Sequence, residues 1–133
     1  MTKQHSVLVF ERRRFWTPEL QRRLAGRSVA VKLCGSATDV LHAIPHLADP
    51  VLILPLRVRA GQPSSRDCLN LQRRVFGQVA RVFSLVLADD STASLECTFR
   101  ELSVSSFSVS HVSGSQLAAL CERQWHPFAA VRR

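Results

Sequence analysis

The feature that most constrains the fold is a short, wholly apolar run at residues 51–54 with a proline on each side. Pro50 and Pro55 cannot donate a backbone hydrogen bond to a neighbouring strand, so they mark the limits of the run. A continuous apolar run of this length is typical of a strand buried on both faces of a parallel sheet. We therefore expect residues 51–54 to form a central strand.

Similar runs recur along the chain, and segments with helical periodicity separate them. Further strands are expected at 6–10, 28–33, 82–87 and 104–109, and helices at about 17–26, 36–44, 68–79, 91–102 and 115–125. Parallel strands need crossover connections, and right-handed crossovers place helices on both faces of a sheet. The pattern predicts an α/β protein with a doubly wound, five-stranded parallel sheet.

Two of the expected helices carry capping signals. Thr17 is a candidate N-cap, with Pro18 at the first helical position. Ser36 is another candidate N-cap, with Asp39 three residues further on. These residues predict where the first two helices begin.

The composition indicates one folded domain. The 133 residues are 46% hydrophobic and 21% charged, which is enough to bury a single core. We expect one domain over residues 1–133, with a core at about 6–125 and a short basic tail at 126–133. No apolar run approaches the ~18 residues that span a bilayer, and no secretory leader is recognisable, so we expect a cytoplasmic protein.

Cysteine and histidine spacing gives no metal-site pattern. His42 and His46 are four residues apart, but Pro45 is expected to interrupt a helix there. All four cysteines lie in apolar stretches without a CxxC pair, so we expect them to be reduced thiols in the core: Cys34, Cys68, Cys97 and Cys121.

The order and spacing of the elements resemble the receiver domain of two-component response regulators over about residues 6–125. Residues 7–10 resemble the first strand of that family, and residues 51–54 resemble the strand that carries its phosphoacceptor. Residues 36–41 and 101–107 resemble its second-helix start and its passage into the fifth strand. The resemblance implies a flavodoxin-like, receiver-like three-layer sandwich.

The residues that carry the chemistry of that family are different here. Glu11 and Arg12 stand where the family is expected to have two acidic residues that bind magnesium. Pro55 stands at the phosphoacceptor aspartate, Ala88 at the hydroxyl residue and Ser110 at the lysine. Proline has no nucleophile, so that position cannot be phosphorylated. The resemblance therefore implies a pseudo-receiver, a non-catalytic and phosphorylation-independent interaction or signalling module that is not an enzyme and has no cofactor.

Ligands of doubly wound sheets bind beyond the carboxyl ends of the strands. Arginines gather at this expected edge, where guanidinium groups would attract an anion or a partner: Arg12, Arg13, Arg14, Arg57 and Arg59. Two alternatives stay open. In the first, the arginines pair with acids of the same chain in solvent; in the second, Glu11 with Asp89 or Asp90 binds a divalent cation weakly.

The formal net charge of +8 gives a second functional reading, in which a basic domain binds nucleic acid or another polyanion non-specifically through the arginine-rich rim. No helix-turn-helix, zinc-finger or RNP-like motif accompanies the charge, and no catalytic motif is present.

For the interaction module, the resemblance places a protein partner or a second copy of the chain at about residues 91–125. Large aromatic side chains concentrate binding energy, so four are candidate anchors: Phe99, Phe107, Trp125 and Phe128. The alternative is that each packs against the sheet of its own chain.

Overall fold

The sheet of this computed structural model contains five parallel strands in the order β2-β1-β3-β4-β5. The structure describes residues 4–56, 61–78, 80–109 and 111–126. The strands are β1 His5–Phe10, β2 Val29–Cys34, β3 Val51–Pro55, β4 Phe83–Leu87 and β5 Ser106–Ser108. The predicted doubly wound parallel sheet is confirmed.

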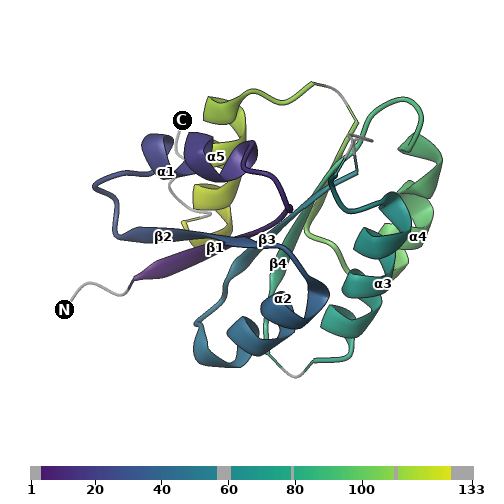
Figure 1. Cartoon of the computed structure of the whole chain (residues 1–133), viewed down its shortest axis with the longest axis horizontal. Coiled ribbons are helices and arrows are strands. Elements are labelled where there is room, and N and C mark those ends of the chain that lie inside the picture. Colours follow the sequence, from purple (N-terminus) through teal and green to yellow (C-terminus); the bar gives the residue numbers. More distant parts are fainter. Residues whose placement is uncertain (1–3, 57–60, 79, 110, 127–133) are drawn as a thin grey trace.

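Helices α1 to α4 connect successive strands and α5 follows the last one, so that helices lie on both faces of the sheet (Figure 1). They are α1 Trp16–Arg23, α2 Ala37–Ala43, α3 Ser65–Phe76, α4 Glu96–Glu101 and α5 Gly114–Trp125, with short 3-10 turns at Ile44–His46 and Ala93–Leu95. Helices α1 and α5 cover one face, and α2, α3 and α4 cover the other. The molecule is a three-layer sandwich.

Successive side chains of each strand point to opposite faces of the sheet, so the core has two parts, one on each face. Val7 and Val9 of β1 pack with α1 and α5, whereas Leu8 and Phe10 pack on the face of α2, α3 and α4. Strand β3 lies between β1 and β4, and its residues 51–54 have 0% exposure. The prediction that residues 51–54 form a central strand is confirmed, and β3 extends one residue further, to Pro55.

Serine side chains cap three helices. Ser36 accepts a hydrogen bond from the Asp39 backbone N–H at 3.1 Å, as predicted. Ser64 and Ser113 form full capping boxes at α3 and α5. In each box the serine side chain accepts a hydrogen bond from the backbone N–H of the residue three positions on, and the side chain of that residue accepts one from the serine backbone N–H. These caps set where the helices leave the carboxyl edge of the sheet.

The predicted N-cap of the first helix is wrong. Helix α1 begins at Trp16, so Thr17 lies inside its first turn, where it is 1% exposed. Phe15 occupies the N-cap position and makes no side-chain cap. The cap comes instead from Glu11, a residue that precedes the helix by a full loop.

Three of the four cysteines are buried as predicted, and burial raises the pKa of Cys68 and Cys121 to about 12 and also raises that of Cys34. Cys97 is exposed, so the prediction for it is wrong. Helix α4 turns Phe99 into the core, and a residue two positions away points to a different side of a helix.

No helix in the described part of the chain is both long enough and apolar enough to cross a membrane.

Candidate functional site

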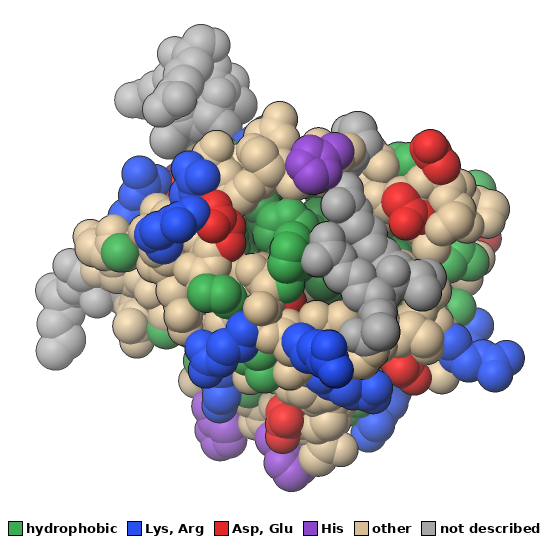
Figure 2. Space-filling model, turned by 45° about the horizontal axis from the view of Figure 1, so that its top comes forward, with side chains coloured by type: hydrophobic (Ala, Val, Ile, Leu, Met, Phe, Trp, Pro, Cys, Tyr) green, Lys and Arg blue, Asp and Glu red, His purple; other side chains and the backbone are tan. Residues whose placement is uncertain are grey.

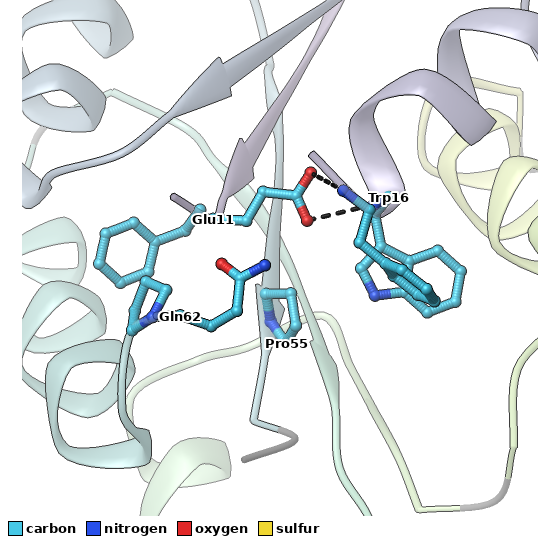
Figure 3. Close-up of a pocket in the computed structure, with 7 residues that line it drawn as sticks. Glu11, Trp16, Pro55 and Gln62 are labelled. Atoms are coloured by element: carbon cyan, nitrogen blue, oxygen red, sulfur yellow. Dashed lines mark hydrogen bonds between the residues drawn. The ribbon is translucent and has the colours of Figure 1, made fainter. Parts of the chain in front are cut away.

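A small hollow lies at the carboxyl ends of β1 and β3 (Figure 3). Its volume of about 20 Å³ gives room for about one water molecule. It is lined by Phe10, Glu11, Phe15, Trp16, Pro55, Gln62 and Pro63. We call this feature the Phe15 hollow. It occupies the edge at which doubly wound sheets bind their ligands.

The Glu11 carboxylate closes one side of the hollow and is turned toward the start of α1 (Figure 3). One carboxylate oxygen accepts from the Trp16 backbone N–H at 3.1 Å. The other accepts from the backbone N–H of Phe15 at 3.1 Å, and from the N–H and hydroxyl of Thr17 at 2.9 and 2.7 Å. A helix N-terminus has unpaired N–H groups and a positive partial charge, so it stabilises this carboxylate although the residue is only 2% exposed.

Gln62 fixes the loop between β1 and α1 from the opposite side. Its amide oxygen accepts from the backbone N–H of Arg12 at 2.8 Å and of Arg13 at 3.3 Å. Its amide nitrogen donates to the Arg13 carbonyl at 2.8 Å. The loop is therefore held by Glu11 at its α1 end and by Gln62 near its centre.

Pro55 ends β3 and points its ring into the hollow (Figure 3). It is paired in register with Leu87 of β4, and the next residue continues the ladder through the hydrogen bond from Leu56 N–H to the Leu87 carbonyl at 2.8 Å. Ala88 is 1% exposed and donates its backbone N–H to the Ser108 carbonyl at 2.7 Å. The side chains of Pro55 and Ala88 have neither a nucleophile nor a hydroxyl group.

Asp89, near this edge, is engaged by its own turn. Asp89 accepts hydrogen bonds from the Ser91 hydroxyl at 2.6 Å and from the Thr92 hydroxyl at 3.0 Å, which hold the pKa of its carboxyl below the usual range. Within the described residues, no group of three or more His, Cys, Asp or Glu side chains is placed to hold a metal ion.

The magnesium site implied by the resemblance does not fit the residues present. Both Glu11 oxygens already accept hydrogen bonds from α1, Arg12 supplies a cation and Pro55 supplies no oxygen from its side chain. A hard cation needs several oxygen ligands at one point. The alternative of a weak metal site built on Glu11 therefore has no support from this geometry.

Exposed arginines lie beside the hollow. Lys and Arg side chains gather next to hydrophobic side chains at the centre of the face shown in Figure 2. Arg12, Arg13 and Arg14 are all exposed on the β1–α1 loop, and Arg12 lies 4.0 Å from the Asp67 carboxylate. Arg57, Arg59 and Ser110 lie outside the described residues.

Two predicted anchors lie inside the core. Phe99 has 0% exposure and Phe107 has 7%, and their ring centroids are 6.0 Å apart. The prediction that these two rings contact a partner is wrong, because both pack inside the core on the face of the sheet that α2, α3 and α4 cover.

Trp125 is half-buried at the end of α5. Its ring stacks on the His5 ring with the centroids 4.4 Å apart, and its indole N–H donates to the Asp49 carbonyl at 2.9 Å. It thereby joins α5 to the start of the sheet. Phe128 lies outside the described residues.

Gln62 and Phe15 were not among the predicted site residues, and the hydrogen bonds from Thr17 to Glu11 were not predicted. Gln62 bonds to residues about fifty positions away, so no local pattern announces it. Phe15 does give a weak signal, because it is an aromatic residue that ends an arginine run immediately before a helix.

Comparison with models of known protein families gives no match, and comparison with curated proteins gives none either. Solved structures do match. FixJ-N superimposes with a TM-score of 0.71 at 18% identity, over 94% of this chain and 96% of that one. The BeF3-activated receiver domain of DrrB superimposes with a TM-score of 0.66 at 12% identity, over 94% and 99%.

This is the fold of a response-regulator receiver domain. Full-length FixJ from B. japonicum gives the same result, with a TM-score of 0.69 at 18% identity over 95% of this chain. This chain spans 59% of the length of that protein. The flavodoxin-like receiver architecture inferred from the sequence is confirmed, with the strand order β2-β1-β3-β4-β5.

Proposed function

We propose that this chain is a pseudo-receiver, a phosphorylation-independent signalling module that binds other proteins and is not an enzyme. One observation carries the proposal. In this receiver fold Pro55 ends β3, where a phosphoacceptor is expected, and the neighbouring Glu11 carboxylate is bonded to α1. Phosphoryl transfer to a receiver needs a nucleophile and a metal at this point, and the side chains here are suited to neither.

The proposed contact region is residues 91–125, which contain α4, β5 and α5. A groove of about 340 Å³ between β5 and α5 supports this choice. Its lining combines exposed Ala119 and half-buried Leu120 with the exposed, charged Arg123. An apolar centre with a polar rim is typical of protein interfaces, in which arginine is enriched. The partner is another protein or a second copy of the chain.

Incubation with acetyl phosphate and Mg²⁺ tests the loss of phosphorylation. We expect the intact mass to stay unchanged, while a receiver that retains its aspartate, treated in parallel, gains one phosphoryl group. A hydroxylamine-sensitive adduct on this chain would show that an aspartyl or glutamyl acceptor is present and would reject the proposal.

A pull-down from a lysate of its own cells tests the interaction. We expect the same partner with and without acetyl phosphate, and weaker recovery with Arg123→Glu at the β5–α5 groove. The matched control is Arg74→Glu, which makes the same charge change on the exposed side of α3. If the chain stays monomeric and recovers no protein above background, the proposal of an interaction module is contradicted.

A further inference from the structure

We propose that the Phe15 hollow docks an acidic protein segment, which inserts the tip of one apolar side chain and pairs its carboxylates with Arg13 and Arg14. This inference rests on the proposed function in one respect, because a phosphoryl group and its metal would need the same place. It names the chemistry of a partner and a second contact surface, separate from the β5–α5 groove.

The apolar part of the site is exposed and small. Phe15 is 43% exposed, and its ring meets the Trp16 ring edge-on at 5.1 Å. Pro55 and Pro63 line the same hollow. A volume of about 20 Å³ admits only the end of an aliphatic side chain, so the rest of that side chain would lie over the exposed Phe15 ring. Covering such a ring removes apolar surface from water.

The site is preorganised. The backbone N–H groups of Phe15, Trp16 and Thr17 are held by Glu11, and those of Arg12 and Arg13 are held by Gln62. A binding loop that is already ordered loses less conformational freedom when a ligand arrives. The hollow therefore needs no rearrangement to receive a side chain.

Uncompensated positive charge lies at the rim. Among the ion pairs of the described residues, Arg12 is paired with Asp67 but neither Arg13 nor Arg14 takes part in one. The Glu11 carboxylate is turned toward α1 and takes part in none of these ion pairs.

The Arg13 side chain lies against Gly61. This glycine has φ +79, and a Cβ atom built on it would lie 2.7 Å from Arg13 Nε. Guanidinium groups bind carboxylates in bidentate fashion, so a glutamate or aspartate beside the apolar anchor would pair with this exposed guanidinium.

The shape of the site favours an acidic peptide over nucleic acid. Single-stranded nucleic acid needs aromatic stacking platforms and cations that follow several phosphates. Here helices cover both faces of the sheet, and the exposed Phe15 ring directly follows the exposed Arg13 and Arg14 on the β1–α1 loop. A short acidic segment with one apolar side chain matches these dimensions.

Fluorescence anisotropy on the full chain tests the proposal. The probe is a labelled nine-residue peptide with a central Leu between four Glu and four Asp, titrated at ~150 mM salt. We expect a dissociation constant on the order of 100 μM, and at least about fivefold weaker binding when the Leu is replaced by Ser.

Matched variants locate the contact. Phe15→Ser should weaken binding about fivefold, and the double variant Arg13→Glu, Arg14→Glu about tenfold or more. Phe76→Ser and the double variant Arg73→Glu, Arg74→Glu should change it less than about twofold, because they alter exposed side chains at the far end of α3. Thermal unfolding confirms that each variant is folded.

Several outcomes would overturn the inference. They are no binding up to ~1 mM peptide, equal binding of the Leu and Ser peptides, equal loss in the α3 controls, or tighter binding of a single-stranded oligonucleotide than of the peptide. Failure of the peptide with no phosphoryl adduct rejects this site alone. A phosphoryl adduct rejects the proposed function whatever the peptide does.

Discussion

The Glu11 carboxylate accepts both the backbone N–H and the hydroxyl of Thr17, at 2.9 and 2.7 Å. This carboxylate follows the last residue of β1 and has an internal partner, the first turn of α1. The positive partial charge of the helix N-terminus stabilises it. The start of α1 therefore depends on a side chain that lies outside the helix.

Replacing Glu11 should destabilise the fold. Glu11→Ala leaves three backbone N–H groups and a buried hydroxyl without their acceptor, and we expect a loss of about 2–4 kcal/mol in the free energy of unfolding. Glu11→Gln keeps one acceptor oxygen and should lose less. Urea denaturation measures both, with the exposed Glu101→Ala as the control at under about 0.5 kcal/mol. An unchanged midpoint for Glu11→Ala would show that the cap does not contribute.

The parts of the fold that could be predicted depend on patterns within about ten residues. Strand β3 was predictable because an apolar run between two prolines has few other solutions, and α2 was predictable because Ser36 caps it locally. The cap of α1 was not, because Thr17-Pro18 imitates a local N-cap while the real acceptor lies on the preceding strand end.

The candidate site was predictable only in outline. The rule that ligands bind at the carboxyl ends of the strands predicts that Glu11 and Pro55 lie at one edge, and both line the Phe15 hollow. Their roles depend on contacts between residues far apart in the sequence, such as the hydrogen bond from Gln62 to the Arg13 carbonyl. No local spacing of residues predicts such a contact. The burial of Phe99 was one of two alternatives that the sequence left open, because a helix of six residues carries too little periodicity to decide between them.

The capping box of α3 should make stability sensitive to acid. Hydrogen bonds from Ser64 hold the pKa of the Asp67 carboxyl below its ordinary value of 3.8. A lowered folded-state pKa contributes stability that is present above the unfolded value and is lost as pH falls through the folded value. Stability should therefore fall below about pH 4, and Asp67→Asn should reduce that dependence.

Ser64→Ala removes the side-chain oxygen that accepts from the Asp67 backbone N–H, and it should lower the free energy of unfolding by about 1 kcal/mol at neutral pH. Ser115→Ala, at an exposed serine in the first turn of α5, is the control. Urea midpoints at about pH 7 and about pH 3 give both results. An Asp67→Asn variant whose stability depends on pH as steeply as the unmodified chain would contradict the assignment.

Thiol labelling should separate the four cysteines. In the native state we expect Cys97 to react readily, because it is exposed, while Cys34, Cys68 and Cys121 react slowly. Burial raises the pKa of Cys68 and Cys121 to about 12, so the reactive thiolate is scarce at neutral pH. Titration with Ellman's reagent should give about one fast equivalent, which Cys97→Ser removes, and four after unfolding. More than one fast equivalent in the native chain would contradict the described burial.

Nucleic-acid binding should be weak and governed by salt. The net charge of +8 attracts phosphates, but the described strands lie between helices and offer no stacking surface. Affinity for DNA or RNA should fall steeply between ~50 and ~200 mM salt, without preference for a sequence. Replacing Arg12, Arg13 and Arg14 should reduce the salt slope by about 0.7–0.9 for each phosphate that the protein no longer neutralises. The control replaces Arg66, Arg73 and Arg74, which are exposed on α3.

Base-edge and stacking contacts survive salt that screens phosphate contacts, so a sequence-specific binder would keep its preference at ~150 mM salt. Strong discrimination there between one oligonucleotide and its scrambled form would make the arginine rim a nucleic-acid site and reverse the ranking of the two functions.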